Sequence, residues 1–112
     1  MLESELRKGS AEVLILGVLQ TCARHGYDVA RVIEERSGGL ISFHSATLYP
    51  TLYRLERKKL ITGQWVERDG QRRRRYYRIT AKGRAALGEQ QTAWTRFFDA
   101  LGRVVSPGEP SK

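Results

Sequence analysis

Four consecutive arginines followed by two tyrosines are the residues of this chain best suited to binding chemistry. They stand in the segment RRRRYYRIT, residues 72–80. The stretch from residue 54 to residue 78 carries ten basic and three acidic side chains, so it accounts for most of the net charge of +8. A local excess of positive charge attracts polyanions, and nucleic acids and anionic membranes both meet that requirement. Charge alone does not choose between these partners.

Other kinds of site find little support among the reactive side chains. Cys22, His25 and His44 are the only soft metal ligands, whereas a zinc centre normally needs four ligands, or three and a water. The neighbouring carboxylates Glu34 and Glu35 point apart on a helix. The sequence also has no glycine-rich phosphate loop and no nucleophile with a matched base. We therefore expect no metal, no cofactor and no enzymatic activity.

The arginines are expected to lie on a β-hairpin. Residues 62–68 and 72–80 are rich in residue types that favour strands, and Asp69-Gly70 between them is a strong signal for a tight turn. Side chains alternate between the two faces of a strand. One face of the second strand is therefore Arg75, Tyr77 and Ile79, and the other is Arg74, Tyr76 and Arg78. The side chains expected to anchor the hairpin on a helical core are Leu60, Ile61, Trp65, Tyr76 and Tyr77.

Two helices are expected near the beginning of the chain. Ser10 can cap the first helix. Its apolar positions, at offsets of four, three and four, are Ala11, Ile15, Val18 and Cys22. The second helix follows a break at His25-Gly26 and ends at Gly38-Gly39, because glycine commonly terminates helices.

A third helix is expected to begin at Ser45. Leu48, Leu52 and Leu55 form its apolar row, and Pro50 predicts a bend or an irregular start. The row that we place on the face opposite those leucines is Thr47, Thr51, Arg54 and Lys58. Together with the hairpin, these helices compose a helix-turn-helix with a wing. The expected fold class is therefore mainly α with a small β-hairpin, an α+β fold.

Three segments of the sequence carry a family resemblance. They are HGYDVARVIEERSGG at 25–39, SATLYPTLYRLERKKLI at 45–61 and RRRRYYRITAKG at 72–83. In their order and spacing, over about residues 9–88, the chain resembles the PadR family of winged-helix transcriptional regulators. The resemblance implies a repressor-type, DNA-binding homodimer. Each subunit would insert its third helix into a major groove, while the wing lies along the flanking backbone or minor groove.

The resemblance also assigns roles to individual residues. Ser45 caps the third helix or offers its amide to a phosphate. Thr47, Tyr49 and Thr51 contact base edges or phosphates, with a core position as the alternative for Tyr49. The side chains expected to reach phosphates are Arg54, Lys58, Arg72, Arg73, Arg74 and Arg75. For the four arginines of the wing, the alternative is solvated surface charge.

The last helix is expected to join two copies of the chain. Thr80 can cap a helix over residues 81–105. The side chains expected at the dimer interface are Leu87, Trp94, Phe97, Phe98, Leu101 and Val105, most of them at coiled-coil spacing. The resemblance also implies an effector, since some compact members of the family bind flat aromatic molecules between the subunits, beside a tryptophan of this helix. Trp94 is therefore an effector-binding hypothesis. The alternative is that Trp94 only anchors the interface.

The remaining expectations concern organisation, location and alternative functions. Residues 1–80 form the winged helix-turn-helix, residues 81–105 the dimerisation helix and residues 106–112 a disordered tail. The longest apolar run, Val13–Leu19, is too short to cross a bilayer, and the acidic N-terminus does not fit a secretory signal. We expect a cytoplasmic protein bound to palindromic duplex DNA. A protein that binds RNA or single strands, and a module for acidic proteins or anionic lipid, are the alternatives.

Overall fold

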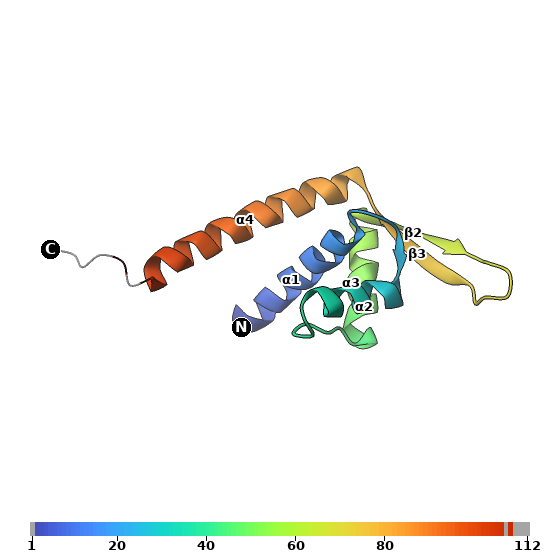
Figure 1. The fold of residues 1–112 in the computed structure, drawn as a ribbon. Coiled ribbons are helices and arrows are strands. Elements are labelled where there is room, and N and C mark those ends of the chain that lie inside the picture. The colour runs from blue at the N-terminus through green and yellow to red at the C-terminus, as the bar shows by residue number, and fades with distance from the viewer. Residues whose placement is uncertain (1, 107, 109–112) are drawn as a thin grey trace.

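The computed structural model contains three helices, a small sheet and a long final helix. Residues 2–106 and 108 are described, with side chains from residue 10 onward. The elements are α1 (Leu2–Leu19), β1 (Arg24–His25), α2 (Gly26–Arg36), α3 (Ser45–Arg57), β2 (Ile61–Val66), β3 (Arg74–Ile79) and α4 (Ala81–Val105). Figure 1 shows the β2–β3 hairpin projecting from one side of the α1–α3 bundle and the end of α4 extending beyond the other. The predicted class, mainly helical with a small β-hairpin, is confirmed.

One hydrophobic core holds the helices and the base of the wing together. Helix α1 contributes Ile15 and Leu19, and helix α3 contributes Leu52 and Leu55, all almost completely buried. The wing adds Leu60, Ile61, Tyr77 and Ile79 to the same cluster. The strand faces predicted from alternation are confirmed, since Tyr77 and Ile79 are buried while Arg74 and Arg78 on the other face are exposed.

Helix α1 differs from its prediction at both ends. It begins at Leu2, so Ser10 lies inside the helix and is not its cap. It ends at Leu19, and Cys22 is exposed, so the prediction that Cys22 belongs to the apolar stripe is wrong. The physical reason lies in β1, a strand that the sequence did not indicate. Arg24 and His25 pair with Tyr77 and Tyr76 of β3, so the helix gives way to a turn and a bend before residue 24 and the chain is extended at residues 24–25.

Helices α2 and α3 lie close to their predicted positions. His25 caps α2, because its Nδ1 atom accepts a hydrogen bond from the Asp28 amide at 3.3 Å. Gly38 and Gly39 follow the helix with φ of +67° and +84°, conformations that favour glycine. Ser45 is the first residue within α3 and His44 occupies the cap position, so the prediction that Ser45 caps α3 is wrong by one residue.

The wing is a longer hairpin than the Asp-Gly signal alone indicates. The strand pairing runs from Ile61↔Ile79 to Val66↔Arg74, and the turn lies within the connecting residues 67–73. The Gln71 amide donates to the Arg68 carbonyl at 3.0 Å, and Gly70 has a φ of +72°. Trp65 is 53% exposed, so its predicted place as a core anchor is wrong. It lies opposite Arg75 in the register instead.

Helix α4 begins as predicted and then leaves the core. The Thr80 hydroxyl accepts a hydrogen bond from the Gly83 amide at 2.9 Å, which confirms the predicted cap. Leu87 is buried within the core of its own chain, so it is not available for the predicted dimer interface. The large apolar side chains beyond it that remain exposed are Phe97, Phe98, Leu101, Val104 and Val105. The predicted disorder of the tail, residues 106–112, falls mainly on residues outside the description.

Candidate nucleic-acid interface

Helix α3 presents a different face to solvent from the one predicted. Thr51 is only 2% exposed. Its hydroxyl donates to the Thr47 carbonyl at 2.8 Å and accepts from Arg54 Nη2 at 3.2 Å. The prediction that Thr51 lies on the exposed side is therefore wrong, and its side chain does not reach a ligand outside the helix. Thr47, one turn earlier, is exposed as predicted.

Arg54 and Lys58 lie beside α1 and share a carboxylate there. Lys58 Nζ is 3.1 Å and Arg54 Nε is 3.8 Å from Oε2 of Glu12. Both cationic side chains remain about half exposed. The carboxylate offsets part of their charge, so they offer less attraction to a phosphate than their sequence indicates. Their contact with phosphate stays a prediction.

The most outward row of α3 was not identified from the sequence. Counting about 100° per residue from the buried leucines places Pro50, Tyr53 and Arg57 directly opposite them. Tyr53 is 63% exposed, and the Arg57 guanidinium lies 5.7 Å from the centre of its ring. Centring the helical wheel on Leu48, Leu52 and Leu55 finds this row. The predicted row of Thr47, Thr51, Arg54 and Lys58 follows residue type instead, because it collects the hydroxyl and cationic side chains.

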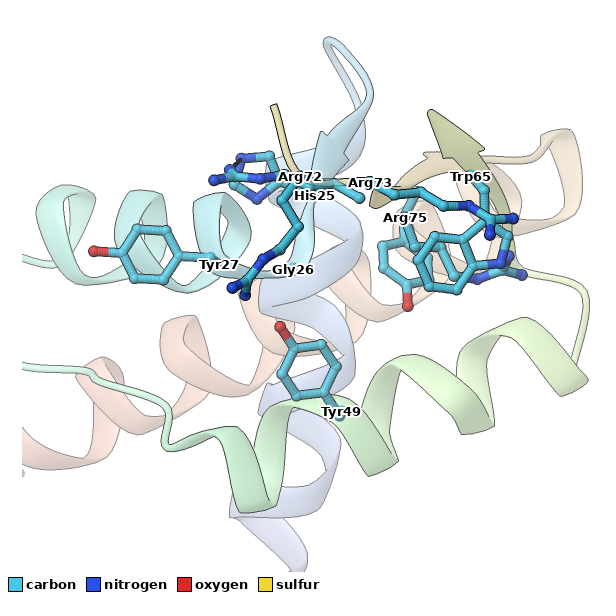
Figure 2. A pocket seen from close by; sticks show the side chains of 10 residues that line it. His25, Gly26, Tyr27, Tyr49, Trp65, Arg72, Arg73 and Arg75 are labelled. Carbon is cyan, nitrogen blue, oxygen red and sulfur yellow. Dashed lines mark hydrogen bonds between the residues drawn. The ribbon is translucent and has the colours of Figure 1, made fainter. Parts of the chain in front are cut away.

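Tyr49 joins helix α3 to the start of α2. Its side chain is 48% exposed, so it is neither a core residue nor fully exposed to solvent. A Cβ atom at Gly26 would lie 2.9 Å from Tyr49 Cε1, so the absence of a side chain at Gly26 lets the ring approach. Figure 2 shows Tyr49 beneath the start of α2, with its hydroxyl directed towards the Gly26 backbone.

Arg75 ties the wing to α3. Its guanidinium pairs with the Glu56 carboxylate and lies 5.6 Å and 5.8 Å from the ring centres of Trp65 and Tyr77. A Cβ atom at Gly63 would be 2.5 Å from Arg75 Nε, so the glycine leaves the space that the guanidinium fills. Burial raises the pKa of the Tyr77 hydroxyl and keeps it neutral. Within the described residues, Arg75 is therefore the member of the run that has a carboxylate partner.

The other three arginines of the run border a cleft. All three are exposed, and none pairs with an acidic side chain among the described residues. Arg73 lies 4.9 Å from the ring centre of Trp65. The cleft has a volume of about 700 Å³, and Figure 2 shows it between the wing and the start of α2. Its lining consists of His25, Gly26, Tyr27, Tyr49, Trp65, Tyr77 and the arginines 72–75.

His25 forms the corner of this cleft, on the α2 side. Its Nε2 atom is 2.8 Å from Arg74 Nη1, and its ring meets Tyr76 edge-on at 5.4 Å. Burial, followed by the positive charge of Arg74, lowers the pKa of His25. Burial would raise the pKa of Asp28, but hydrogen bonds from Arg31 and Arg24 outweigh it and hold that pKa below its usual value. Asp28 is therefore a paired carboxylate at neutral pH.

The second half of α4 carries an aromatic cluster, away from the cleft. Trp94 and Phe98 stack with ring centres 5.4 Å apart, and Phe97 meets Trp94 edge-on at 6.4 Å. All three are predicted interface residues, and Trp94 is also the predicted effector residue. The three rings contact one another, on a helix whose far end extends beyond the α1–α3 bundle (Figure 1).

Within residues 10–106, no group of three or more His, Cys, Asp or Glu side chains is placed to hold a metal ion. Among the helices that the structure describes, none combines the length and the apolar character needed to cross a membrane.

The chain is similar to known proteins over most of its length. The profile of the transcriptional regulator PadR-like family matches residues 15–89. A transcriptional regulator of Mycobacterium tuberculosis is 39% identical over 90 residues, which cover 80% of this chain and 66% of that protein. An uncharacterised protein of Lysinibacillus sphaericus is 32% identical over 101 residues, covering 90% and 93% of the two chains.

Solved structures resemble the fold closely. A transcriptional regulator from Clostridium thermocellum has a TM-score of 0.81 at 25% identity, covering 91% of this chain and 99% of the other. A PadR-like transcription factor from Bacteroides fragilis has a TM-score of 0.79 at 29% identity, covering 93% and 98%. The similarity therefore includes the wing and most of α4.

Proposed function

This chain belongs to the transcriptional regulator PadR-like family and is a DNA-binding regulator of transcription, and we propose that it acts as a homodimeric repressor. In this proposal α3 enters the major groove of a duplex, while the wing follows the flanking phosphates. A repressor bound to chromosomal DNA would work in the cytoplasm.

The observation that carries the proposal is the position of the arginine run. Arg72, Arg73 and Arg74 lie at the tip and outer face of a paired strand, on the side of the molecule where Tyr49 borders the same cleft. All three line the same cleft, so their positive charges act on one region of the surface. The exposed row of α3, with Tyr53 and Arg57, gives the adjoining surface for base contacts. Ser45 and Thr47 remain candidates at the start of that helix.

The proposed dimer rests on the exposed apolar side of α4. Phe97 and Phe98 are each 54% exposed, and Leu101, Val104 and Val105 continue the surface. Exposed apolar side chains that follow one another along a helix mark an interaction surface. A two-fold pair of such helices would place two recognition helices about 34–36 Å apart, one turn of DNA, and the operator would then be palindromic.

Trp94 supports a finer proposal about an effector. In the proposed dimer, the stacked pair of Trp94 and Phe98 would border the space between subunits. A flat aromatic molecule would fit beside such rings and relieve repression. Titration of tryptophan fluorescence with planar aromatic compounds tests this. Because Trp65 also fluoresces, the variant Trp65→Phe should keep the quenching and Trp94→Phe should lose it. A panel of compounds that leaves the fluorescence unchanged would contradict the effector proposal.

Selection of bound fragments from randomised duplex DNA is the main experiment. The full chain should enrich a palindromic site, and a promoter that contains this site should be transcribed less in its presence. Arg73→Gln should weaken binding to every sequence and reduce the slope of log K against log salt by about 1. Arg103→Gln, the same change at the far end of α4, should leave both quantities unchanged. Equal affinity for single strands, or no affinity for any duplex at low salt, would contradict the proposal.

A further inference from the structure

His25 has two hydrogen-bond contacts that a neutral imidazole does not satisfy together. Nδ1 accepts from the Asp28 amide at 3.3 Å, and Nε2 lies 2.8 Å from Nη1 of Arg74. A neutral histidine has one N–H and one acceptor nitrogen. If Nδ1 is the acceptor that caps α2, Nε2 must carry the hydrogen of the neutral ring. That N–H then points at the N–H of Arg74, so two donors face each other. If Nε2 accepts from Arg74 instead, the cap is lost.

Among the described groups around His25, none offers a further acceptor that would satisfy both donors. From β3 it faces Arg74 and the ring of Tyr76, and from α2 it faces Asp28, Arg31 and the ring of Tyr27. The one carboxylate among them, Asp28, already accepts hydrogen bonds from Arg31 and from Arg24 at 2.9 Å. No further acidic group is placed to accept from Arg74 within the described residues.

An oxyanion resolves the conflict. With Nδ1 retained as the cap, Nε2–H and the Arg74 guanidinium both donate, and an oxygen with several lone pairs accepts from both. The site lies at the first turn of α2, where the helix dipole favours negative charge. It also opens on the cleft bordered by Arg72 and Arg73, which raises the local positive potential.

We propose that His25 and Arg74 form a phosphate-binding pair, filled in the DNA complex by an oxygen of the duplex backbone. This deepens the proposed function and rests on it for the identity of the phosphate. A bound phosphate adds negative charge beside the imidazole and favours its protonated form. The second proton then occupies Nδ1, so protonation replaces the 3.3 Å hydrogen bond from the Asp28 amide with the stronger attraction to the phosphate. Binding therefore takes up protons, and the complex becomes stronger as the pH falls from 8 to 6.

The direct experiment follows both histidines of the full chain by NMR. The chain contains two histidines, so the variant His44→Asn assigns the Hε1 signals of each. His25 is titrated alone, with inorganic phosphate, and with a fluorescein-labelled duplex of random sequence, all at equal ionic strength. We expect the duplex to raise the His25 titration midpoint. Arg74→Gln should remove this rise, whereas Arg78→Gln, the same change on the same face of β3, should keep it.

The pH dependence of duplex affinity gives a second readout. A purely structural role of His25 would not produce this dependence. For a rise of one pH unit in the midpoint, affinity should increase by up to about tenfold between pH 8 and pH 6. His25→Asn retains a cap-forming oxygen but does not titrate, so its affinity should change much less over that range. His44→Asn should respond like the unaltered chain.

The outcomes separate the inference from the proposed function. A midpoint raised by duplex but not by phosphate supports a backbone site, and one raised by both supports a site that also accepts free phosphate. If duplex binds but neither probe moves the His25 midpoint, the phosphate-binding pair is refuted and the proposed function stands. If duplex does not bind at all, the proposed function fails. The titration with inorganic phosphate then tests the pair alone: a raised His25 midpoint supports it, and an unchanged midpoint refutes it.

Discussion

At the level of single residues, the four arginines of the wing share one side-chain type but have different neighbours. Arg75 has a carboxylate partner, Glu56, and fills the space above Gly63. Arg74 meets a histidine, and Arg73 lies over Trp65. An arginine paired with a carboxylate releases fewer counterions on binding DNA than a solvated one. We therefore expect Arg72, Arg73 and Arg74 to bind phosphate, and Arg75 to hold the wing in position.

His25 should make the stability of the unbound protein depend on pH. Its pKa is lowered in the folded chain, so the unfolded chain binds the proton more readily. The resulting contribution to the free energy of unfolding is present above about pH 6.5 and is lost as the pH falls towards the folded pKa. Urea denaturation at pH 7.5 and 5.5 measures it. The pKa of Asp28 is lowered from 3.8, so that carboxylate stays ionised over this range.

The variant His25→Asn should lose less stability between these two pH values than the unaltered chain does. His44→Asn is the matched control and should lose as much as the unaltered chain. Equal losses in all three proteins would show that another group titrates.

At the level of elements, the orientation of α3 decides which of its side chains read DNA. Tyr53→Ala should lower the preference for the selected operator over random duplex, because it removes an exposed side chain from the outward row. Thr51→Val should leave that preference unchanged. It should lower the free energy of unfolding by about 1 kcal/mol, since it removes the bond to the Thr47 carbonyl. Competition binding and urea denaturation measure the two effects, and a changed preference in Thr51→Val would contradict this orientation.

The start of α4 depends on a glycine that touches backbone. A Cβ atom at Gly83 would lie 2.1 Å from the Leu60 carbonyl oxygen, which also accepts from the Thr80 amide at 3.0 Å. Gly83→Ala should therefore lower the free energy of unfolding by about 1–3 kcal/mol. Gly88 lies in the same helix with nothing near its Cβ position, so Gly88→Ala should raise it by about 0.5–1 kcal/mol. Similar effects of both changes would contradict the predicted contact.

At the level of the whole molecule, the free end of α4 should determine assembly. Phe98→Glu places a charge in the centre of the exposed aromatic cluster. It should raise the dimer dissociation constant by about thirtyfold or more, the effect of a hot-spot residue worth about 2 kcal/mol. Thr92→Glu adds the same charge on the opposite side of α4 and should leave it unchanged. Sedimentation equilibrium measures both variants, and an unaltered chain that stays monomeric at high concentration would refute the dimer.

Local patterns in the sequence were enough to predict most elements of this protein. Helix α2, the beginnings of α3 and α4, and the alternating faces of β3 each follow from residues within a few positions of one another. Periodicity, the Thr80 cap and the glycines after α2 act over that short range. The family resemblance was equally visible, because it depends on the order and spacing of such segments.

Only the tertiary structure decided which residues face solvent and which meet each other. Strand β1 exists because His25 pairs with Tyr76, distant in sequence, and that pairing ends α1 before Cys22. Thr51 is buried although its residue type predicted exposure. Burial and pairing depend on which elements pack together, and a local pattern does not contain that information.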